Sequence, residues 1–145
     1  MRVGLIRILG FVFFGVIIMV ENNILRAFQK IRKVWYVNEW WYSVVDIVKV
    51  LNGVVNVLRY LPELKNDIAK EGFNINDFVM DLELTGSDGQ IEITDCITMR
   101  AAFRMVQSIH SKNAEPFKMW FAQIGAETLK EWDNPELIME RLFRL

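Results

Sequence analysis

The sequence has little of the chemistry that metal sites and catalytic sites need, with one cysteine, one histidine and three prolines in 145 residues. The single Cys96 excludes an intrachain disulfide, and with the single His110 it cannot form a zinc site of the usual Cys/His kind. Gly86 and Gly89 belong to a predicted hairpin turn and not to a phosphate-binding loop. We interpret Cys96 as a small buried hydrophobic residue and His110 as a loop residue. We therefore expect no metal, no cofactor, no small-molecule substrate and no enzymatic activity, in a reducing cytoplasm.

The sequence also lacks an excess of positive charge. It has 17 basic and 18 acidic residues; Arg2 and Arg7 are the only charged residues among the first 20, so 15 basic and 18 acidic residues remain after them, a net charge of −3. Proteins that bind nucleic acid gain much of their affinity by neutralising phosphates with Lys and Arg. The composition excludes a globally basic nucleic-acid-binding protein and leaves a local basic patch as the alternative.

An uncharged apolar run extends from Ile8 to Val20, directly after the two arginines. A positively charged start before a short apolar stretch is typical of a signal peptide, and the run is short for a membrane span of about 20 residues. No convincing small-residue cleavage site follows it. We divide the chain into a hydrophobic N-terminal extension, residues 1–20, and one domain, residues 21–145.

Hydrophobic residues make up 52% of the chain, which is enough for one domain with a buried core. Alternating apolar and polar residues on either side of turn residues predict two antiparallel hairpins. These hairpins occupy residues 30–42 and 82–94. Apolar residues at helical spacing predict helices over 44–51 and 54–72 and from residues 99, 115 and 136 onward. We expect Pro62 to interrupt the second helix or to start a new one. The predicted fold is α+β: small antiparallel hairpins packed with four to five helices in a single compact domain.

Helix-capping residues mark several of these predicted starts. Ser43 followed by Asp46 has the spacing of a capping box, and Thr98 precedes the helix that begins at residue 99. Asn113 is expected to cap the long helix, with Glu115 and Pro116 in its first turn, where a carboxylate and a missing N–H are both favourable.

The long helix is expected to bury one apolar face, and a second start signal follows it. That face contains Phe117, Trp120, Phe121, Ile124 and Leu129, which recur at three- and four-residue spacing. Asn134-Pro135-Glu136 then repeats the pattern of a capping amide, a proline and an acid. The interval from Ser108 to Leu137 is therefore predicted to be two packed helices.

The same interval resembles the end of the Bro-N domain, which occurs in phage and prophage antirepressors and in related baculovirus proteins. The residues shared with that family are Gln107-Ser108-Ile109, Ser111, Ala114-Glu115-Pro116-Phe117-Lys118, Trp120, Ala122, Gly125, Glu127, Glu131 and Asn134-Pro135-Glu136-Leu137. The resemblance extends back to about Ile31. Met19 opens the segment MVENNILRAF, which is similar to the usual start of such proteins. Residues 1–18 are then an upstream extension from a misplaced start codon, a genuine membrane anchor or a cleaved signal.

The resemblance implies a non-enzymatic regulatory protein that binds DNA through its N-terminal region. The residues that it carries over are Trp41, Tyr42, Ser43, Asp46, Ile47 and Leu51. We interpret Ser43 and Asp46 as capping residues, and Ile47 and Leu51 as packing residues. The candidate DNA contacts are Arg32, Lys33, Trp41, Lys49, Asn52, Arg59, Lys65, Lys112 and Lys118. The residues assigned to the structural motif are Ser43, Asp46, Glu115, Pro116, Phe117, Trp120 and Pro135.

The chain departs from the family between residues 54 and 65. Family members have several Arg or Lys here, whereas this chain keeps Arg59 and Lys65 and has Val and Leu at polar positions. Losing three such cations lowers DNA affinity by roughly tens- to hundreds-fold at moderate salt. The apolar residues at 54–58 could instead form a protein contact. The alternatives are therefore a module that sequesters a phage repressor protein, a degenerate remnant without strong DNA binding and a membrane-anchored form. The oligomeric state stays open.

Overall fold

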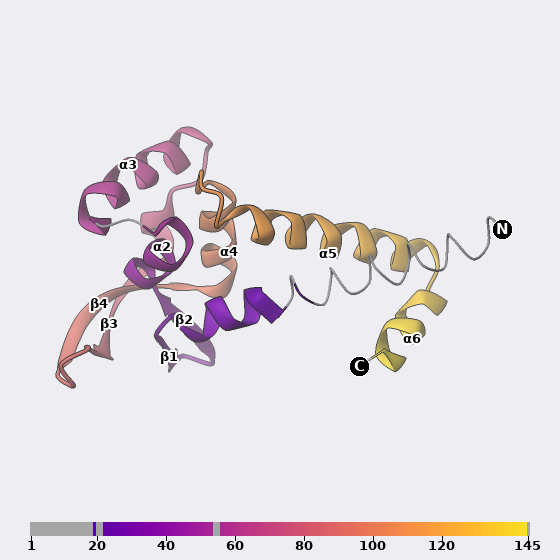
Figure 1. Ribbon diagram of the computed structural model, residues 1–145, viewed down its shortest axis with the longest axis horizontal. Coiled ribbons are helices and arrows are strands. Elements are labelled where there is room, and N and C mark those ends of the chain that lie inside the picture. The colour runs from indigo at the N-terminus through magenta and orange to yellow at the C-terminus, as the bar shows by residue number, and fades with distance from the viewer. Residues whose placement is uncertain (1–18, 20–21, 54–55, 145) are drawn as a thin grey trace.

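The structure is a computed structural model that describes residues 19, 22–53 and 56–144. In these residues, ten helices and strands follow a short helix at residues 22–29 (Figure 1). They are β1 (Lys33–Tyr36), β2 (Glu39–Ser43), α2 (Val44–Asn52), α3 (Val57–Lys70), the 3₁₀ helix η1 (Ile75–Phe78), β3 (Val79–Thr85), β4 (Ile91–Thr98), α4 (Met99–Gln107), α5 (Glu115–Asp133) and α6 (Glu136–Phe143). The predicted α+β class and single compact domain are confirmed. The predicted hydrophobic extension lies outside the described residues apart from Met19.

The four strands form one antiparallel sheet in the order β1-β2-β4-β3. Both predicted hairpins are present, and β2 pairs with β4 at the register Trp41↔Thr98, which joins them edge to edge. The first hairpin begins later than predicted, because residues 30 and 31 form the turn that ends the helix at 22–29. Since β2 and β4 are far apart in sequence, their pairing brings the segments that follow them, α2 and α4, side by side on the sheet.

The main core lies between the helices and one face of the sheet. Val44, Ile47, Val48 and Leu51 of α2 are buried there with Leu61, Leu64 and Ile68 of α3 and with Ala101, Ala102, Met105 and Val106 of α4. Ile97 and Tyr42 extend into it from the strands. A smaller cluster of Trp41, Leu84 and Cys96 packs elsewhere on the sheet. Cys96 is fully buried, as predicted, and burial raises the pKa of its thiol to about 11.

The predicted helix caps agree with the structure in part. The Ser43 hydroxyl accepts from the Asp46 N–H at 3.3 Å, and the Thr98 hydroxyl accepts from the Ala101 N–H at 3.3 Å. The assignment of Asn113 was wrong, because the Ser111 hydroxyl accepts from the Ala114 N–H at 3.2 Å while α5 itself has no side-chain cap.

Helix α3 differs from the prediction in its length and in the effect of its proline. It covers Val57–Lys70 and runs through Pro62 without a break. Pro62 removes one backbone hydrogen bond near the helix start, and the buried Leu61 and Leu64 on either side hold the helix against the core. The predicted apolar patch at 54–58 includes Val54 and Val55, which lie outside the described residues; Leu58 within it is exposed.

Helix α5 projects away from the sheet, and α6 folds back near its end (Figure 1). Phe117 is buried and Trp120 and Phe121 are half-buried, as the predicted apolar face requires. The prediction fails farther along, because Ile124 is 41% and Leu129 is 63% exposed. At the far end of the helix, Glu131 pairs with Arg141 of α6 at 3.1 Å. Across the described residues, none of the helices combines the length and hydrophobicity that a membrane crossing needs.

Candidate nucleic-acid interface

An ion-pair network centred on Arg32 fixes the start of α2 against the two hairpins. The Arg32 Nε and Nη2 donate to the two carboxylate oxygens of Asp46 at 2.8 and 3.0 Å, and its backbone N–H also donates to Asp46 at 2.9 Å. Its Nη1 reaches Glu92 of β4 at 2.7 Å. Burial opposes the charge on Asp46, yet these hydrogen bonds outweigh it and hold the pKa of Asp46 below its usual value. The same bonds raise the pKa of Arg32.

A groove lined by several basic side chains lies beside this network, between the helix at 22–29, the end of α2 and the start of α5. It has a volume of about 440 Å³ and is lined by Arg26, Lys30 and Lys112. Within the described part of the chain no carboxylate lines it. Lys30 and Val50 also line the adjoining groove that contains Lys49. These four cations, Arg26, Lys30, Lys49 and Lys112, are called the basic face below.

Backbone and side-chain contacts position the loop that presents Lys112. The Ser111 hydroxyl donates to the carbonyl of Leu51 at 2.6 Å, which ties the loop to the C-terminal end of α2. Gly53 ends α2 in the left-handed conformation, with φ at 59°, and a Cβ added there would lie 3.7 Å from the Asn113 side chain. The loop therefore has a fixed place next to Lys30, although its residues come from a distant part of the sequence.

The chemistry of the basic face suits phosphate groups. Its four cations are exposed, and none forms an ion pair with a described carboxylate. Unpaired Lys and Arg side chains around a shallow groove can each neutralise one backbone phosphate and release its counterions. The face could position a nucleic-acid backbone, whereas it offers few groups that would read bases.

The structure brings together only some of the predicted DNA contacts. Lys49 and Lys112 belong to the basic face, and Asn52 lies at the end of α2 near them. Lys33 lies over the ring of Trp40, 4.4 Å from its centroid, on the first hairpin. Three cations lie away from both grooves: Arg59 and Lys65 on α3 and Lys118 on α5. A DNA contact at each of these residues stays a prediction.

Arg32 and Trp41 have structural partners that occupy their side chains. Arg32 donates to Asp46 and Glu92, so its charge is already neutralised. Trp41 is 9% exposed, packs with Leu84 and Cys96, and donates from its indole N–H to the Tyr36 carbonyl at 3.1 Å. We leave both residues out of the basic face for these reasons.

Sequence reasoning missed Arg26 and Lys30. Arg26 is on the helix at 22–29 and Lys30 follows directly in the turn that ends it, four residues later, and both stand in sequence between the buried Ile24 and Ile31. Two cations at this spacing lie on one helix face, opposite the apolar one. This spacing is present in the sequence and could have indicated them.

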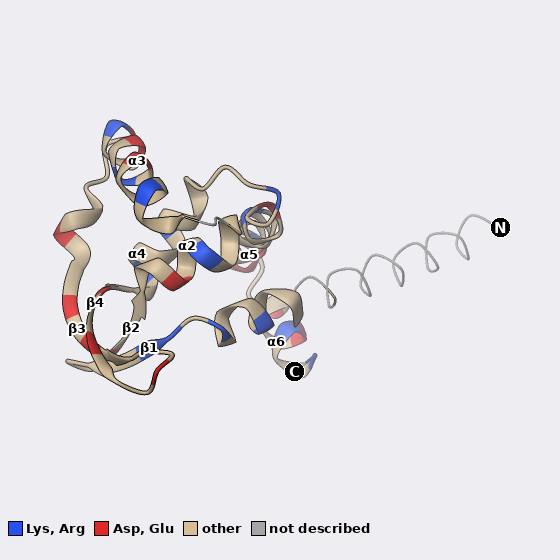
Figure 2. Ribbon diagram, turned by 60° about the vertical axis from the view of Figure 1, so that its left-hand side comes forward, with Lys and Arg blue, Asp and Glu red and all other residues tan. Residues whose placement is uncertain are grey.

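The β3–β4 hairpin has the opposite charge. Its side chains include five carboxylates, Asp81, Glu83, Asp88, Glu92 and Asp95, and no Lys or Arg. Figure 2 shows the acidic residues along these strands and basic residues on the neighbouring helices. Asp88 and Glu92 line the groove that contains Lys49, so the acidic hairpin borders the basic face.

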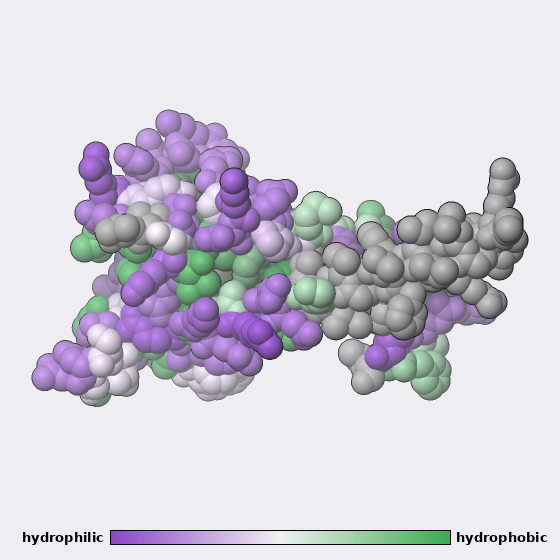
Figure 3. Space-filling view, in the orientation of Figure 1, coloured by the Kyte–Doolittle hydropathy of each residue, from purple (hydrophilic) through white to green (hydrophobic). Residues whose placement is uncertain are grey.

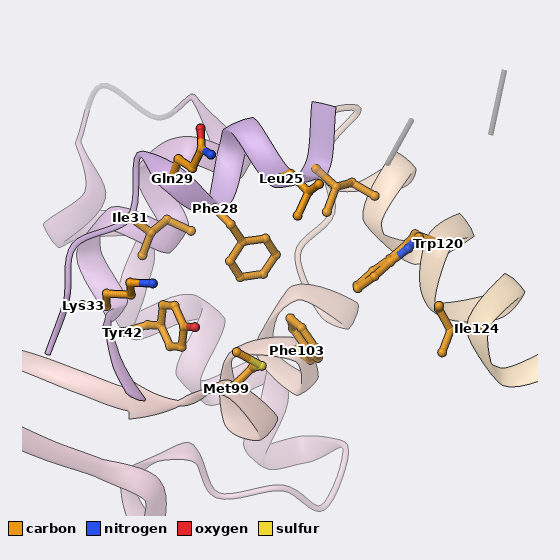
Figure 4. A pocket seen from close by; sticks show the side chains of 11 residues that line it. Leu25, Phe28, Gln29, Ile31, Lys33, Tyr42, Met99, Phe103, Trp120 and Ile124 are labelled. Atoms are coloured by element: carbon orange, nitrogen blue, oxygen red, sulfur yellow. The ribbon is translucent and has the colours of Figure 1, made fainter. Parts of the chain in front are cut away.

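A second, apolar pocket of about 650 Å³ lies between the helix at 22–29, α4 and α5. Figure 4 shows the rings of Phe28, Phe103 and Trp120 around it. Phe103 contacts both of the other rings edge to face, at centroid distances of 5.6 and 5.9 Å. Leu25 and Met99 at its rim are 60% and 42% exposed. An exposed apolar pocket of this kind is typical of ligand or protein contact.

Comparison with known proteins gives one match. The family model described as Bro-N, the BRO family N-terminal domain, matches residues 30–128, which is more than half of the chain. The matched range includes the sheet, α2, α3, α4 and most of α5. No curated protein and no solved structure matches the chain.

Proposed function

Because the chain belongs to the BRO family through its N-terminal domain, we propose that it is a non-enzymatic regulatory module of phage or prophage type that binds DNA through the basic face. The observation that carries this proposal is the gathering of Arg26, Lys30, Lys49 and Lys112 around two adjoining grooves. The overall charge of the chain is −1, so attraction to DNA has to come from a local group of cations such as this one and not from the charge of the whole chain.

The number of cations on the basic face predicts how strongly DNA binding depends on salt. Four phosphate contacts predict that the logarithm of the binding constant falls with the logarithm of salt concentration with a slope of roughly −3 to −4. This is a modest footprint, comparable with weak, sequence-independent binding. The loss of basic residues at 54–65, noted in the sequence, leaves α3 with little to add, because the paired Lys65 lies 3.7 Å from Asp95.

A fluorescence-anisotropy titration of the full chain with double-stranded DNA, at several salt concentrations, tests the proposal. We expect Lys30→Glu with Lys49→Glu to weaken binding at least tenfold and to reduce the salt slope by about 2. The matched control is Lys70→Glu, a lysine on α3 that lines neither groove. Equal losses in the control and the double variant, or binding without salt dependence, would contradict the proposal.

The apolar pocket supports a second function, the sequestering of a repressor protein. Its apolar lining and exposed rim suit the apolar face of an amphipathic helix. Calorimetric titration with a phage repressor of the helix-turn-helix class tests this function. We expect Met99→Glu, at the rim, to abolish such binding and leave DNA binding unchanged, whereas Lys30→Glu with Lys49→Glu should do the reverse. A repressor that binds both variants alike excludes the pocket as its site.

A further inference from the structure

The outward face of α5 is apolar although it is exposed. Met119, Leu129 and Trp132 are 62%, 63% and 77% exposed, and the small residues Ala122, Gly125 and Ala126 between them are exposed as well. At 100° per residue all six fall within a sector of about 140°. Three charged residues lie between them in sequence, and all three fall outside this sector: Glu127 and Glu131 point to the other side of the helix, and Lys130 lies next to the edge of the sector. Figure 3 shows hydrophobic side chains along the edge of α5 and on α6.

Gly125 is the residue that the domain itself does not explain. It lies in the middle of a 19-residue helix, where glycine destabilises by about 1 kcal/mol relative to alanine. A Cβ added to Gly125 would meet nothing within 4 Å, and the backbone there has no positive φ. The absence of a side chain at this position would let another backbone approach closely from outside the domain.

The order of residues along this face is complementary to itself. If a second α5 is laid antiparallel and centred between Gly125 and Ala126, those two residues face each other at the crossing point. Ala122 then faces Leu129, a small side chain opposite a large one. Met119 lies at the level of Trp132, and Lys118 lies at the level of Asp133 at both ends of the contact. Neither Lys118 nor Asp133 forms an ion pair within the described residues.

We propose that α5 is the contact surface of an antiparallel homodimer, in which Gly125 lets the two helices approach closely and Lys118 pairs with Asp133 of the second copy. Small residues at a crossing bring helix axes to about 8 Å, the short end of the usual range. The exposed Leu142 and Phe143 on the adjacent α6 add to the apolar area. Together these side chains present on the order of several hundred Å², the scale of one side of a standard interface.

The charge pairs allow a sharp test by sedimentation equilibrium of the full chain without DNA. We expect Lys118→Asp to weaken the dimer, because both charged contacts become repulsive, and Asp133→Lys to do the same. An equimolar mixture of the two variants should dimerise again, and so should the chain that carries both substitutions. Failure of the mixture and of the double variant to regain the affinity of the original chain would overturn the antiparallel pairing.

Gly125 provides an independent test that separates dimerisation from folding. Gly125→Gln should raise the dimer dissociation constant by roughly ten- to a hundredfold, since its side chain blocks the close approach. Gly125→Ala should have a much smaller effect. Both variants should melt at or above the temperature of the original chain at low concentration, because a Cβ meets nothing within the domain. Association that Gly125→Gln leaves unchanged, or a chain that is monomeric from the outset, overturns the proposal. Neither result bears on the DNA-binding proposal.

Discussion

The basic face and the β3–β4 hairpin lie next to each other, yet they are built in opposite ways. The basic face takes its four cations from three separate segments, the helix at 22–29, α2 and the loop before α5. The hairpin takes its five carboxylates from one continuous segment. A charge patch from one segment is visible in the sequence, whereas a patch from three segments appears only when the chain folds. A net charge of −1 therefore conceals two surfaces of opposite sign.

Arg32 joins the two surfaces, since it binds Asp46 of α2 and Glu92 of the hairpin at the same time. The Asp46 side chain is 15% exposed, and that of Glu92 is 54% exposed. The first ion pair is largely shielded from water and the second is not. A substitution of Arg32 therefore removes an ion pair from each of the two surfaces at once.

Arg32→Ala is expected to have the largest effect of the changes considered, a loss of roughly 2–3 kcal/mol of unfolding free energy. The cause is the Asp46 carboxylate, which would lose two side-chain hydrogen bonds in a half-buried place. Urea denaturation monitored by circular dichroism measures this loss of unfolding free energy. The matched control, Glu92→Gln, should cost less than about 1 kcal/mol because that pair is exposed. If both substitutions cost the same, the shielding of Asp46 has no energetic role.

Acid should act on the same contact. The pKa of Asp46 is lowered in the folded state, so its contribution is fully present above the pKa of an ordinary aspartate, about 4, and is lost as the pH falls below that value. Glu71 behaves in the same direction, because hydrogen bonds from Arg104 and Ser108 lower its pKa. We expect thermal stability to fall between about pH 4 and pH 2. Asp46→Asn should make this decline shallower, and an unchanged slope would contradict the assignment.

The border between the surfaces can be tested by removing one carboxylate. Asp88 lines the groove that contains Lys49, so Asp88→Asn should strengthen DNA binding by a few-fold at low salt. Asparagine keeps the side-chain oxygen that accepts from the Gln90 N–H at 3.0 Å. The matched control is Glu83→Gln, which makes the same charge change on the same hairpin but lines neither groove. Anisotropy titrations that show equal gains for both would mean that only net charge matters.

Local patterns in the sequence predicted much of the fold. Both hairpins, the Ser43 and Thr98 caps and the helical positions of α2 and α4 depend on residues close together in the chain, and they are confirmed. The pairing of β2 with β4 depends on residues more than 50 apart, and no short pattern specifies it. The exposure of Leu129 could not be predicted for a related reason. An apolar stripe shows which helix face avoids water, but not how far the rest of the domain extends along it.

The candidate site was less accessible to sequence reasoning than the fold. Lys49 was identified because α2 has a clear apolar face and Lys49 lies opposite it. Arg32 was grouped with it on charge alone, because the partners that neutralise it, Asp46 and Glu92, are 14 and 60 residues away. Lys112 was named without its neighbours, since the contact between Ser111 and Leu51 that brings it to α2 also spans 60 residues. In the sequence an unpaired cation cannot be distinguished from a paired one, because the pairing depends on these long-range contacts.

The smallest effect is expected inside the hairpin, at the pair Asp81 and Asp95. These residues lie directly opposite each other on β3 and β4, and a hydrogen bond to Asp95, with the repulsion between the two charges, raises the pKa of Asp81. A raised carboxyl pKa means that ionisation destabilises the fold above that pKa and has no effect at lower pH. Asp81→Asn should therefore raise the melting temperature slightly at pH 7 and leave it unchanged near pH 3. A gain of equal size at both pH values would assign the effect to strand propensity and not to charge. Within the described residues the hairpin keeps this repulsion and the four cations of the basic face have no carboxylate partner, so this arrangement of charge works against the stability of the domain.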